Sequence, residues 1–565
     1  MRQATAIVGL LLASALILPA SAQMPKSGDD RSDARSMVIT RGGIVASDQV
    51  LASQAAAEIL ARGGSAADAA IAANAAMGVL EPMMNGIGGD LFAIEYDAKT
   101  GRLSGLNSSG WAPAKMTPAL FKEKGLTSIP QRGIDSVTVP GAVAGWAALH
   151  ARFGRLPWKE LFRPAIYYAE HGFPVTQFVA AWWQDNAKVL EQYHATLYLP
   201  GGKTPAVGQI FRNPELARTL QLIADQGPDA FYKGAIAKGI LETSGKAGGV
   251  MTASDLADFQ PEWVDPISTT YHGWSVYELP PNGQGMAALE MLNIMERFPL
   301  AADGFDSARA FHVKMAAQQL AYADLNKYLG DPRFAQVPVK GILSKEYAAE
   351  RARAIDPDKA TCSVGPGNPL PFGGETTYLT AIDRDGNIVS LIQSLYNEFG
   401  SAVVVDGLGF PLQDRGALFS LDPSSPNVVA PRKRPFHTII PGFMQKGPLH
   451  VGFGIMGGAN QPQAHAQFVS DVVDHGMDLQ GALEAPRFRN VGSAGCSYYM
   501  ENRVPEAVRG ALAKMGYTIR LRGAFSSVVG GGHAVMYDAA TGMKYGASSP
   551  RKDGAAIPEP EPIFK

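Results

Sequence analysis

Cysteine is almost absent from this chain. Among 565 residues only Cys362 and Cys496 occur, and neither stands in a C-x-x-C pattern, which argues against a structural zinc site. The sequence says nothing about the distance between their Cα atoms, so a disulfide between them stays open. An excess of one charge is lacking as well, because 50 Lys and Arg residues face 52 Asp and Glu residues. A net charge of −2 gives no basic surface and no reason to expect a nucleic-acid partner.

Several catalytic motifs are also missing. The chain has no G-x-S-x-G elbow, no H-E-x-x-H helix, no G-x-x-x-x-G-K-[ST] loop and no dinucleotide-binding fingerprint after a strand. The histidines, among them His437, His450, His465 and His533, are scattered without metal-ligand spacing. The sequence therefore predicts neither a metal nor an organic cofactor.

Long hydrophobic runs occur only at the N-terminus. Residues 4–18 are apolar, Ala20-Ser21-Ala22 forms an A-x-A cleavage site, and the run is too short to span a bilayer. We interpret residues 1–22 as a signal peptide, with an uncleaved anchor or a buried helix as the alternative. The polar residues 23–36 then predict a disordered lead-in. The mature protein is expected to be exported, periplasmic or secreted, and free of the membrane.

The rest of the chain has globular patterning, with 46% hydrophobic residues. It predicts helices at 54–61 and 66–79, a strand at 91–96 and a helical middle from 141 to about 330. Proline and glycine concentrate between 356 and 374, which indicates an exposed linker. A β-hairpin follows directly, with strands at 376–382 and 388–394.

The junction between linker and hairpin reads Gly373-Gly374-Glu375-Thr376-Thr377. A threonine hydroxyl is a poor nucleophile and needs an adjacent base. If the chain is cut between Glu375 and Thr376, the threonine gains an α-amine with a reference pKa of about 7.7–8.0, which can accept the proton of its own hydroxyl. A Thr-Thr pair is also ordinary strand sequence, so this motif needs support from elsewhere.

That support comes from residues spread over the whole mature chain. They are the run from Gly373 to Ser401 and the segments P-R-K-R-P at 431–435, G-I-M-G-G at 454–458, N-G-I-G-G-D at 85–90, W-A-P-A-K at 111–115, P-G-A-V-A-G at 140–145, Y-A-D at 322–324, G-D-P at 330–332 and Y-G-A-S at 545–548. In this order they resemble the γ-glutamyltransferase (glutathione hydrolase) family of N-terminal-nucleophile hydrolases.

The resemblance implies an α+β fold, an αββα four-layer sandwich of two stacked antiparallel sheets between helix layers. It also implies self-cleavage into a large subunit, residues 37–375, and a small catalytic subunit, residues 376–565, which stay together in one shared domain. Thr376 matches the family nucleophile, and Gly457 with Gly458 matches the pair whose N–H groups form the oxyanion hole. The same comparison suggests that Thr377, Ser394 and Asn397 orient the nucleophile.

The sequence departs from the family where the glutamyl head would bind. Where the family has an arginine that binds the α-carboxylate, this chain has Ser109, and where it has an aspartate that binds the α-amine, this chain has Leu418. The family's serine pair, which also contacts the carboxylate, is replaced by His437-Thr438. Arg415 lies near the same contacts and, with His437, could bind a carboxylate. Arg415 could equally be a structural ion-pair residue. The pattern is similar to a divergent branch that includes oxamate amidohydrolase and cephalosporin-acylase-type enzymes.

Three functions remain open. The first is cleavage of γ-glutamyl amides such as glutathione through an acyl-enzyme on Thr376, because that activity dominates the family. The second is an acylase for a small carboxylate-bearing amide that lacks the α-amine, of glutaryl or oxamate type, which Ser109 and Leu418 favour. The third is an exported binding or structural protein that is never processed, against which the intact Thr376 argues.

Overall fold

The computed structural model describes residues 33–364, 375–492 and 494–563. The predicted signal peptide, most of the lead-in and the last part of the linker lie outside the described residues. Residues 33–36, the end of the expected disordered lead-in, are described and make specific contacts. Ala34 and Arg35 donate backbone hydrogen bonds to the Glu484 carboxylate, and the Arg35 guanidinium donates to the Ser548 carbonyl.

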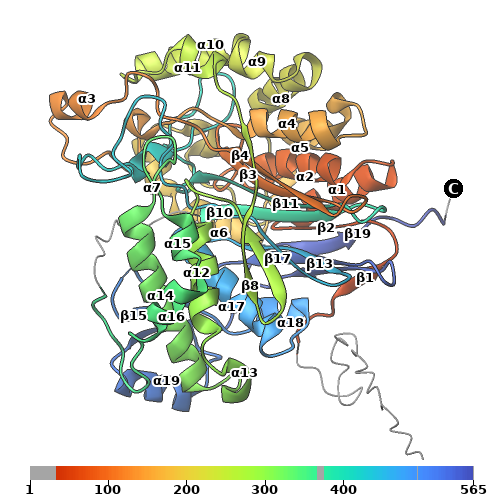
Figure 1. Ribbon diagram of the computed structural model, residues 1–565. Coiled ribbons are helices and arrows are strands. Elements are labelled where there is room, and N and C mark those ends of the chain that lie inside the picture. Colours follow the sequence, from red (N-terminus) through yellow and green to blue (C-terminus); the bar gives the residue numbers. More distant parts are fainter. Residues whose placement is uncertain (1–32, 365–374, 493, 564–565) are drawn as a thin grey trace, which may run out of the picture.

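Two seven-stranded antiparallel sheets lie face to face between layers of helices (Figure 1). The first sheet has, in spatial order, β19 (Ala555–Pro558), β2 (Ile44–Ser47), β10 (Glu375–Ile382), β11 (Ile388–Tyr396), β3 (Asp90–Asp97), β4 (Arg102–Ser108) and β7 (Glu262–Val264). The second sheet has β1 (Val38–Thr40), β18 (Lys544–Ser548), β17 (Gly532–Asp538), β13 (Leu449–Ile455), β12 (Gly442–Lys446), β9 (Trp274–Glu278) and β8 (Ile267–Tyr271). The predicted αββα sandwich is confirmed.

Both faces of the first sheet are buried, and successive side chains of its strands point into two different cores. Tyr378 and Ile392 point into the core between the sheets, while Leu379 and Leu391 point into the core below the upper helices. Successive side chains of a strand project to opposite faces, so a continuous apolar run suits a sheet covered on both sides. Each such side chain contributes about 1.5–3 kcal/mol when fully buried.

One helix layer packs on the outer face of the first sheet (Figure 1). It contains α1 (Val50–Ala61), α2 (Ala66–Leu80), α4 (Ala142–Phe153), α5 (Arg163–His171) and α8 (Pro214–Gln226). The central helix α2 begins at Ser65, where Ser65 and Asp68 form a reciprocal capping box. Such a cap contributes about 1 kcal/mol. Its alanines allow close contacts on every side, and an added Cβ at Gly78 would lie 3.2 Å from the Cα of Gly86.

The other helix layer covers the second sheet (Figure 1). It contains α12 (Gly285–Met295), α14 (Ala308–Tyr328), α17 (Gln461–Val473) and α18 (Leu479–Glu484). Smaller elements surround the two layers: α3 (Pro118–Glu123), α6 (Gln177–Asp185), α7 (Ala187–Gln192), α9 (Asp229–Tyr232), α10 (Ala235–Lys246), α11 (Ala253–Ala257), α13 (Leu300–Asp303), α15 (Val339–Ile342), α16 (Lys345–Ala352), α19 (Glu506–Lys514), β5 (Phe173–Pro174), β6 (Ile210–Phe211), β14 (Phe488–Asn490), β15 (Ser497–Glu501) and β16 (Thr518–Arg522).

The expected helical middle is only partly helical. Residues 262–278 form β7, β8 and β9, of which β8 and β9 make a hairpin at the edge of the second sheet. Their burial alternates, and the turn at His272-Gly273 has positive φ at both residues, 45° and 82°. That is the geometry of a two-residue hairpin, and the alternation in W-S-V-Y-E is the sequence feature that should have outweighed the helical prediction.

The two cysteines are joined. Cys362 and Cys496 form a disulfide with a Cα–Cα distance of 5.0 Å, and the described residues contain no free cysteine. Cys362 precedes the predicted cleavage site and Cys496 follows it. Cleavage before Thr376 would therefore leave one covalent link between the fragments.

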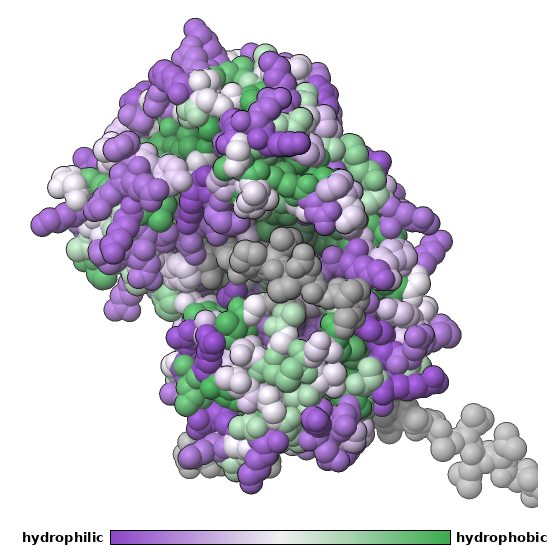
Figure 2. All heavy atoms as spheres, turned by 90° about the vertical axis from the view of Figure 1, so that its left-hand side faces the viewer, coloured by the Kyte–Doolittle hydropathy of each residue, from purple (hydrophilic) through white to green (hydrophobic). Residues whose placement is uncertain are grey.

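The outer surface carries polar and charged side chains over much of the face in Figure 2, with apolar residues gathered in smaller areas between them. Large exposed hydrophobic residues, such as Tyr167, Val207 and Phe334, come from separate elements. Within the described residues, no helix combines the length and the apolar character needed to cross a membrane.

Candidate functional site

Thr376 lies at the start of β10, at an irregularity in the pairing of β10 with β11. Its side chain is fully buried. The Thr376 hydroxyl accepts a hydrogen bond from the Gln461 side-chain amide, with a distance of 3.3 Å between Oγ1 and Nε2. Gln461 is the first residue of α17, so the N-terminus of that helix lies against the threonine hydroxyl.

Gly457 and Gly458 form the turn between β13 and α17. Their φ angles are 122° and 58°, values that a residue with a Cβ rarely adopts, which explains the glycine pair. Among the described residues, the hydrogen bonds around this turn use the carbonyl oxygens of the pair and not its N–H groups: Asn460 N donates to Gly457 O, and Gln284 Nε2 donates to Gly458 O. The N–H groups at the start of a helix have no partner within it, and they carry a partial positive charge.

Segment 437–440 connects this turn to a second group of buried polar residues. The Gln284 side-chain amide donates to both Thr438 O and Gly458 O, which fixes the two segments side by side. Two residues further on, the Ile440 N–H donates to Gln461 Oε1 at 2.9 Å.

Arg415 is the central member of the second group. It lies in a short 3-10 turn, its side chain is fully buried, and its guanidinium stacks 5.0 Å from the centroid of the Tyr396 ring. Its Nη1 donates to Thr438 Oγ1 at 2.6 Å, whereas Nε and Nη2 have no acceptor among the described residues. Burial lowers the pKa of the Arg415 guanidinium to about 10, so it remains charged at neutral pH.

His437 faces Asp90, with 2.6 Å between Nε2 and Oδ2. Asp90 also accepts hydrogen bonds from the Gly110 N–H and the Gln413 side-chain amide. Burial lowers the pKa of His437 to about 4, and the neighbouring Arg415 charge acts in the same direction, so the ring is neutral at pH 7. Because a carboxylate accepts, the proton sits on Nε2 and Nδ1 presents a lone pair.

Thr377 and Asn397 were expected to orient Thr376, but their described hydrogen bonds go elsewhere. Thr377 Oγ1 accepts from the Asn85 side-chain amide at 2.9 Å. Asn397 donates its backbone N–H and its side-chain amide to Asp414, whose pKa burial raises to about 6. Ser394 Oγ accepts from the Tyr396 N–H at 2.7 Å.

Comparison with known proteins gives the family. Residues 52–559 match the family described as Gamma-glutamyltranspeptidase. The chain belongs to this family. It is 37% identical to the glutathione hydrolase-like YwrD proenzyme of Bacillus subtilis, over 92% of this chain and 99% of that protein. It is 34% identical to the oxamate amidohydrolase proenzyme of Klebsiella pneumoniae, over 92% and 98%. The crystal structure of cephalosporin acylase from Bacillus halodurans superposes with a TM-score of 0.88 at 40% identity, covering 95% of this chain and 99% of that one. The gamma-glutamyltranspeptidase family consists of enzymes, and several relatives are named as proenzymes.

Leu418 and Ser109 stand where the chain departs from the expected family pattern. Leu418 packs in an apolar core, and Ser109 makes neutral hydrogen bonds. Leu418 is 3% exposed and belongs to the apolar core below the second sheet. Ser109 is fully buried, donates from its hydroxyl to Asn107 Oδ1 at 2.7 Å and accepts from Asn282 Nδ2 at 3.1 Å. Neither position offers a charge to a glutamyl zwitterion.

Sequence reasoning missed three residues that this site brings together. Asp90 entered the sequence analysis only as the last residue of the N-G-I-G-G-D motif. An aspartate between apolar residues is expected to be buried and to need a partner, which could have suggested a contact with a histidine. Gln284 and Gln461 carried no feature that separates them from other glutamines. Their importance comes from contacts between segments far apart in the chain.

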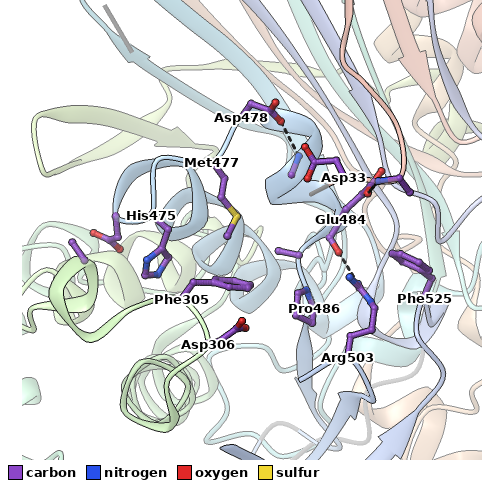
Figure 3. Close-up of a pocket in the computed structure, with 15 residues that line it drawn as sticks. Asp33, Phe305, Asp306, His475, Met477, Asp478, Glu484, Pro486, Arg503 and Phe525 are labelled. Carbon is purple, nitrogen blue, oxygen red and sulfur yellow. Dashed lines mark hydrogen bonds between the residues drawn. The ribbon is translucent and has the colours of Figure 1, made fainter. Parts of the chain in front are cut away.

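A separate pocket of about 730 Å³ lies beside α18 and contains none of these residues (Figure 3). Its carboxylates are largely engaged with the protein itself. Glu484 binds the backbone of residues 34–35, and Asp478 caps α18 by accepting from Gly481 N. The candidate site is therefore the buried one around Thr376. Within the described residues, no three His, Cys, Asp or Glu side chains come together as metal ligands.

Proposed function

We propose that this protein is a self-cleaving threonine amidohydrolase that removes a small carboxylate-bearing acyl group from an amine. The observation that carries the proposal is Arg415, a fully buried cation whose Nε and Nη2 atoms have no partner among the described residues. At position 418, where an aspartate would bind an ammonium group, the chain has the apolar Leu418. A buried charge without a close partner is costly, and a substrate carboxylate would supply that partner.

Maturation begins at the bond between Glu375 and Thr376. The Thr376 hydroxyl attacks the Glu375 carbonyl, the C–N bond breaks, and the acyl group moves to oxygen as an ester. The hydroxyl proton passes to the departing nitrogen, which becomes the free α-amine of Thr376. Water then hydrolyses the ester, which restores the Thr376 hydroxyl and leaves Glu375 as a carboxylate. The two fragments stay associated because β10 is paired with β2 of the large fragment and with β11 of the small one.

Turnover uses the same hydroxyl with the new amine as base. Thr376 Oγ gives its proton to the amine and attacks the substrate carbonyl, and the oxyanion is stabilised by the N–H groups of Gly457 and Gly458. The protonated amine then gives its proton to the leaving amine. Water, or another amine in a transfer reaction, releases the acyl group from Thr376.

The acyl group binds at the other end of the site. Arg415 binds its carboxylate through Nε and Nη2, and Thr438 holds the third nitrogen of the guanidinium. His437, neutral and oriented by Asp90, presents a lone pair and cannot donate to the acyl carboxylate, which leaves that role to Arg415. Ser109 closes the pocket where the family arginine would stand.

Cleavage of γ-glutamyl amides such as glutathione is the second candidate. It is favoured by the 37% identity to the glutathione hydrolase-like protein of Bacillus subtilis over nearly the full length of both chains. Against it stand the apolar Leu418 and the engaged Ser109, which provide no charge for the α-amino acid.

The expected export fits the disulfide. Cys362 and Cys496 would be reduced in most cytosols and remain paired in the periplasm or outside the cell.

The test is a donor panel on purified protein. Glutaryl, oxamate-type and γ-glutamyl amides are compared at equal concentration, together with the neutral amide of each carboxylate. We expect the glutaryl or oxamate-type donors to be turned over faster than the γ-glutamyl donors. N-terminal sequencing of the small fragment should begin at Thr376. A faster γ-glutamyl reaction would replace the first candidate by the second.

A further inference from the structure

The Gln461 side chain contacts the Thr376 hydroxyl, and a backbone N–H fixes the orientation of its amide. Its Oε1 accepts from the Ile440 N–H at 2.9 Å, and its Nε2 lies 3.3 Å from Thr376 Oγ1. A backbone N–H can only donate, so the atom facing Ile440 must be the amide oxygen and the atom facing Thr376 must be the nitrogen. The side chain is fully buried, which holds this arrangement in place.

We propose that Gln461 is a further catalytic residue, which donates a hydrogen bond to the nucleophilic oxygen of Thr376. The inference rests on the proposed role of Thr376. An amide nitrogen cannot accept, so Thr376 Oγ accepts and its own proton points away from Gln461. That proton is then free to pass to the α-amine when Oγ bonds to the substrate carbonyl carbon.

The same hydrogen bond has an electrostatic role. Negative charge develops on Oγ as its proton leaves, and a donor already in place stabilises that charge without reorganising. Gln461 opens α17, so the partial positive charge at the helix N-terminus adds to the effect. Self-cleavage uses the same oxygen, so Gln461 should assist maturation as well as turnover.

Two substitutions separate this role from packing. Gln461→Met keeps the length of the side chain and removes both polar atoms. Gln461→Glu keeps the shape and the acceptor for Ile440 but replaces the donor by a second oxygen. The matched control is Gln467→Met: Gln467 lies on the same helix, is 3% exposed, and bonds to Phe488 and Gln463 instead of Thr376.

We expect Gln461→Met to slow both self-cleavage and kcat by about 10- to 100-fold with little change in KM. Gln461→Glu should be slower still at pH 8, because a carboxylate repels the developing oxyanion. A protonated carboxyl group can donate, so the rate of Gln461→Glu relative to wild type should rise as the pH is lowered toward 5. Gln467→Met should lower the thermal midpoint while self-cleavage and kcat stay within about threefold of wild type.

The result that overturns the inference is a Gln461→Met protein within threefold of wild type in both reactions, or a Gln461→Glu to wild-type ratio that does not change with pH. If one variant does not fold, the other decides. A wild-type protein that is not cut before Thr376 would instead remove the proposed function itself, so the two failures are distinguishable.

Discussion

The two ends of the site differ in the groups that form them. The proposed reaction end, Thr376 with Gly457, Gly458 and Gln461, offers a hydroxyl, backbone N–H groups and a neutral amide. The proposed acyl-binding end combines residues from three segments, Asp90, Arg415 and His437-Thr438, and contains buried charges. Gln284 joins the two ends by donating to Thr438 O and Gly458 O.

This difference teaches how the substrate could change while the chemistry is kept. Neutral donors around a hydroxyl suit the oxyanion of any amide, and they discriminate little between acyl groups. A buried ion discriminates strongly, because the wrong ligand leaves it desolvated and unpaired. Substitutions at the two ends should therefore affect different measurements.

The largest effect is expected at the reaction end. Thr376→Ala removes the nucleophile and should leave a single uncut chain with turnover reduced by at least about 10⁴-fold. Denaturing gels after reduction and a turnover assay measure the two effects. Cutting at the same bond in the alanine variant would show that another protease makes the cut.

A smaller and more selective effect is expected from Arg415→Gln. Loss of a buried, charge-assisted pair should lower kcat/KM for carboxylate-bearing donors by about 30- to 1000-fold, which corresponds to about 2–4 kcal/mol. Self-cleavage should proceed normally, because it involves no substrate. The control is the neutral amide of the same donor. An equal fall for charged and neutral donors would make Arg415 a structural residue and end the distinction between the two ends.

His437→Gln should lower kcat/KM by only about 10-fold, since the glutamine side chain can still donate a hydrogen bond to Asp90. The rise of activity with pH should keep its shape, because the α-amine and not His437 is the base.

The stability of the His437→Gln variant should respond differently to pH. The pKa of His437 is about 4 in the folded protein against about 6.5 unfolded, so the unfolded state binds more protons between these values and stability falls as the pH drops from 6.5 to 4. The variant should show a shallower fall of its thermal midpoint over this range. A changed pH–rate profile would place His437 at the reaction end.

The smallest effect on activity is expected from Cys362→Ser. The disulfide lies in neither end of the site, so turnover at 25 °C should stay within about twofold of wild type, while the thermal midpoint falls. Mature wild-type protein should run as one band on a non-reducing denaturing gel and as two after reduction, whereas the serine variant should run as two under both conditions. Two bands for the unreduced wild type would mean that Cys362 and Cys496 are not paired.

Local pattern predicted the hairpin of β10 and β11 well, because alternation, an Asp383 turn and Gly386 all act between near neighbours. It predicted α1, α2 and β3 for the same reason. It failed at β8 and β9, where alternation was present but was outweighed by helical patterns on both sides. It could not place Thr377 and Asn397, because their partners Asn85 and Asp414 are set by how the strands pack.

By itself the sequence determined the family, the sandwich fold and the position of the candidate nucleophile, since ordered motifs and strand periods are properties of the chain. The tertiary structure alone decided which residues surround that nucleophile. Hydrogen bonds such as Gln461 to Thr376, His437 to Asp90 and Gln284 to Gly458 join residues at least 85 positions apart. Such contacts depend on the stacking of the two sheets, which no local pattern specifies.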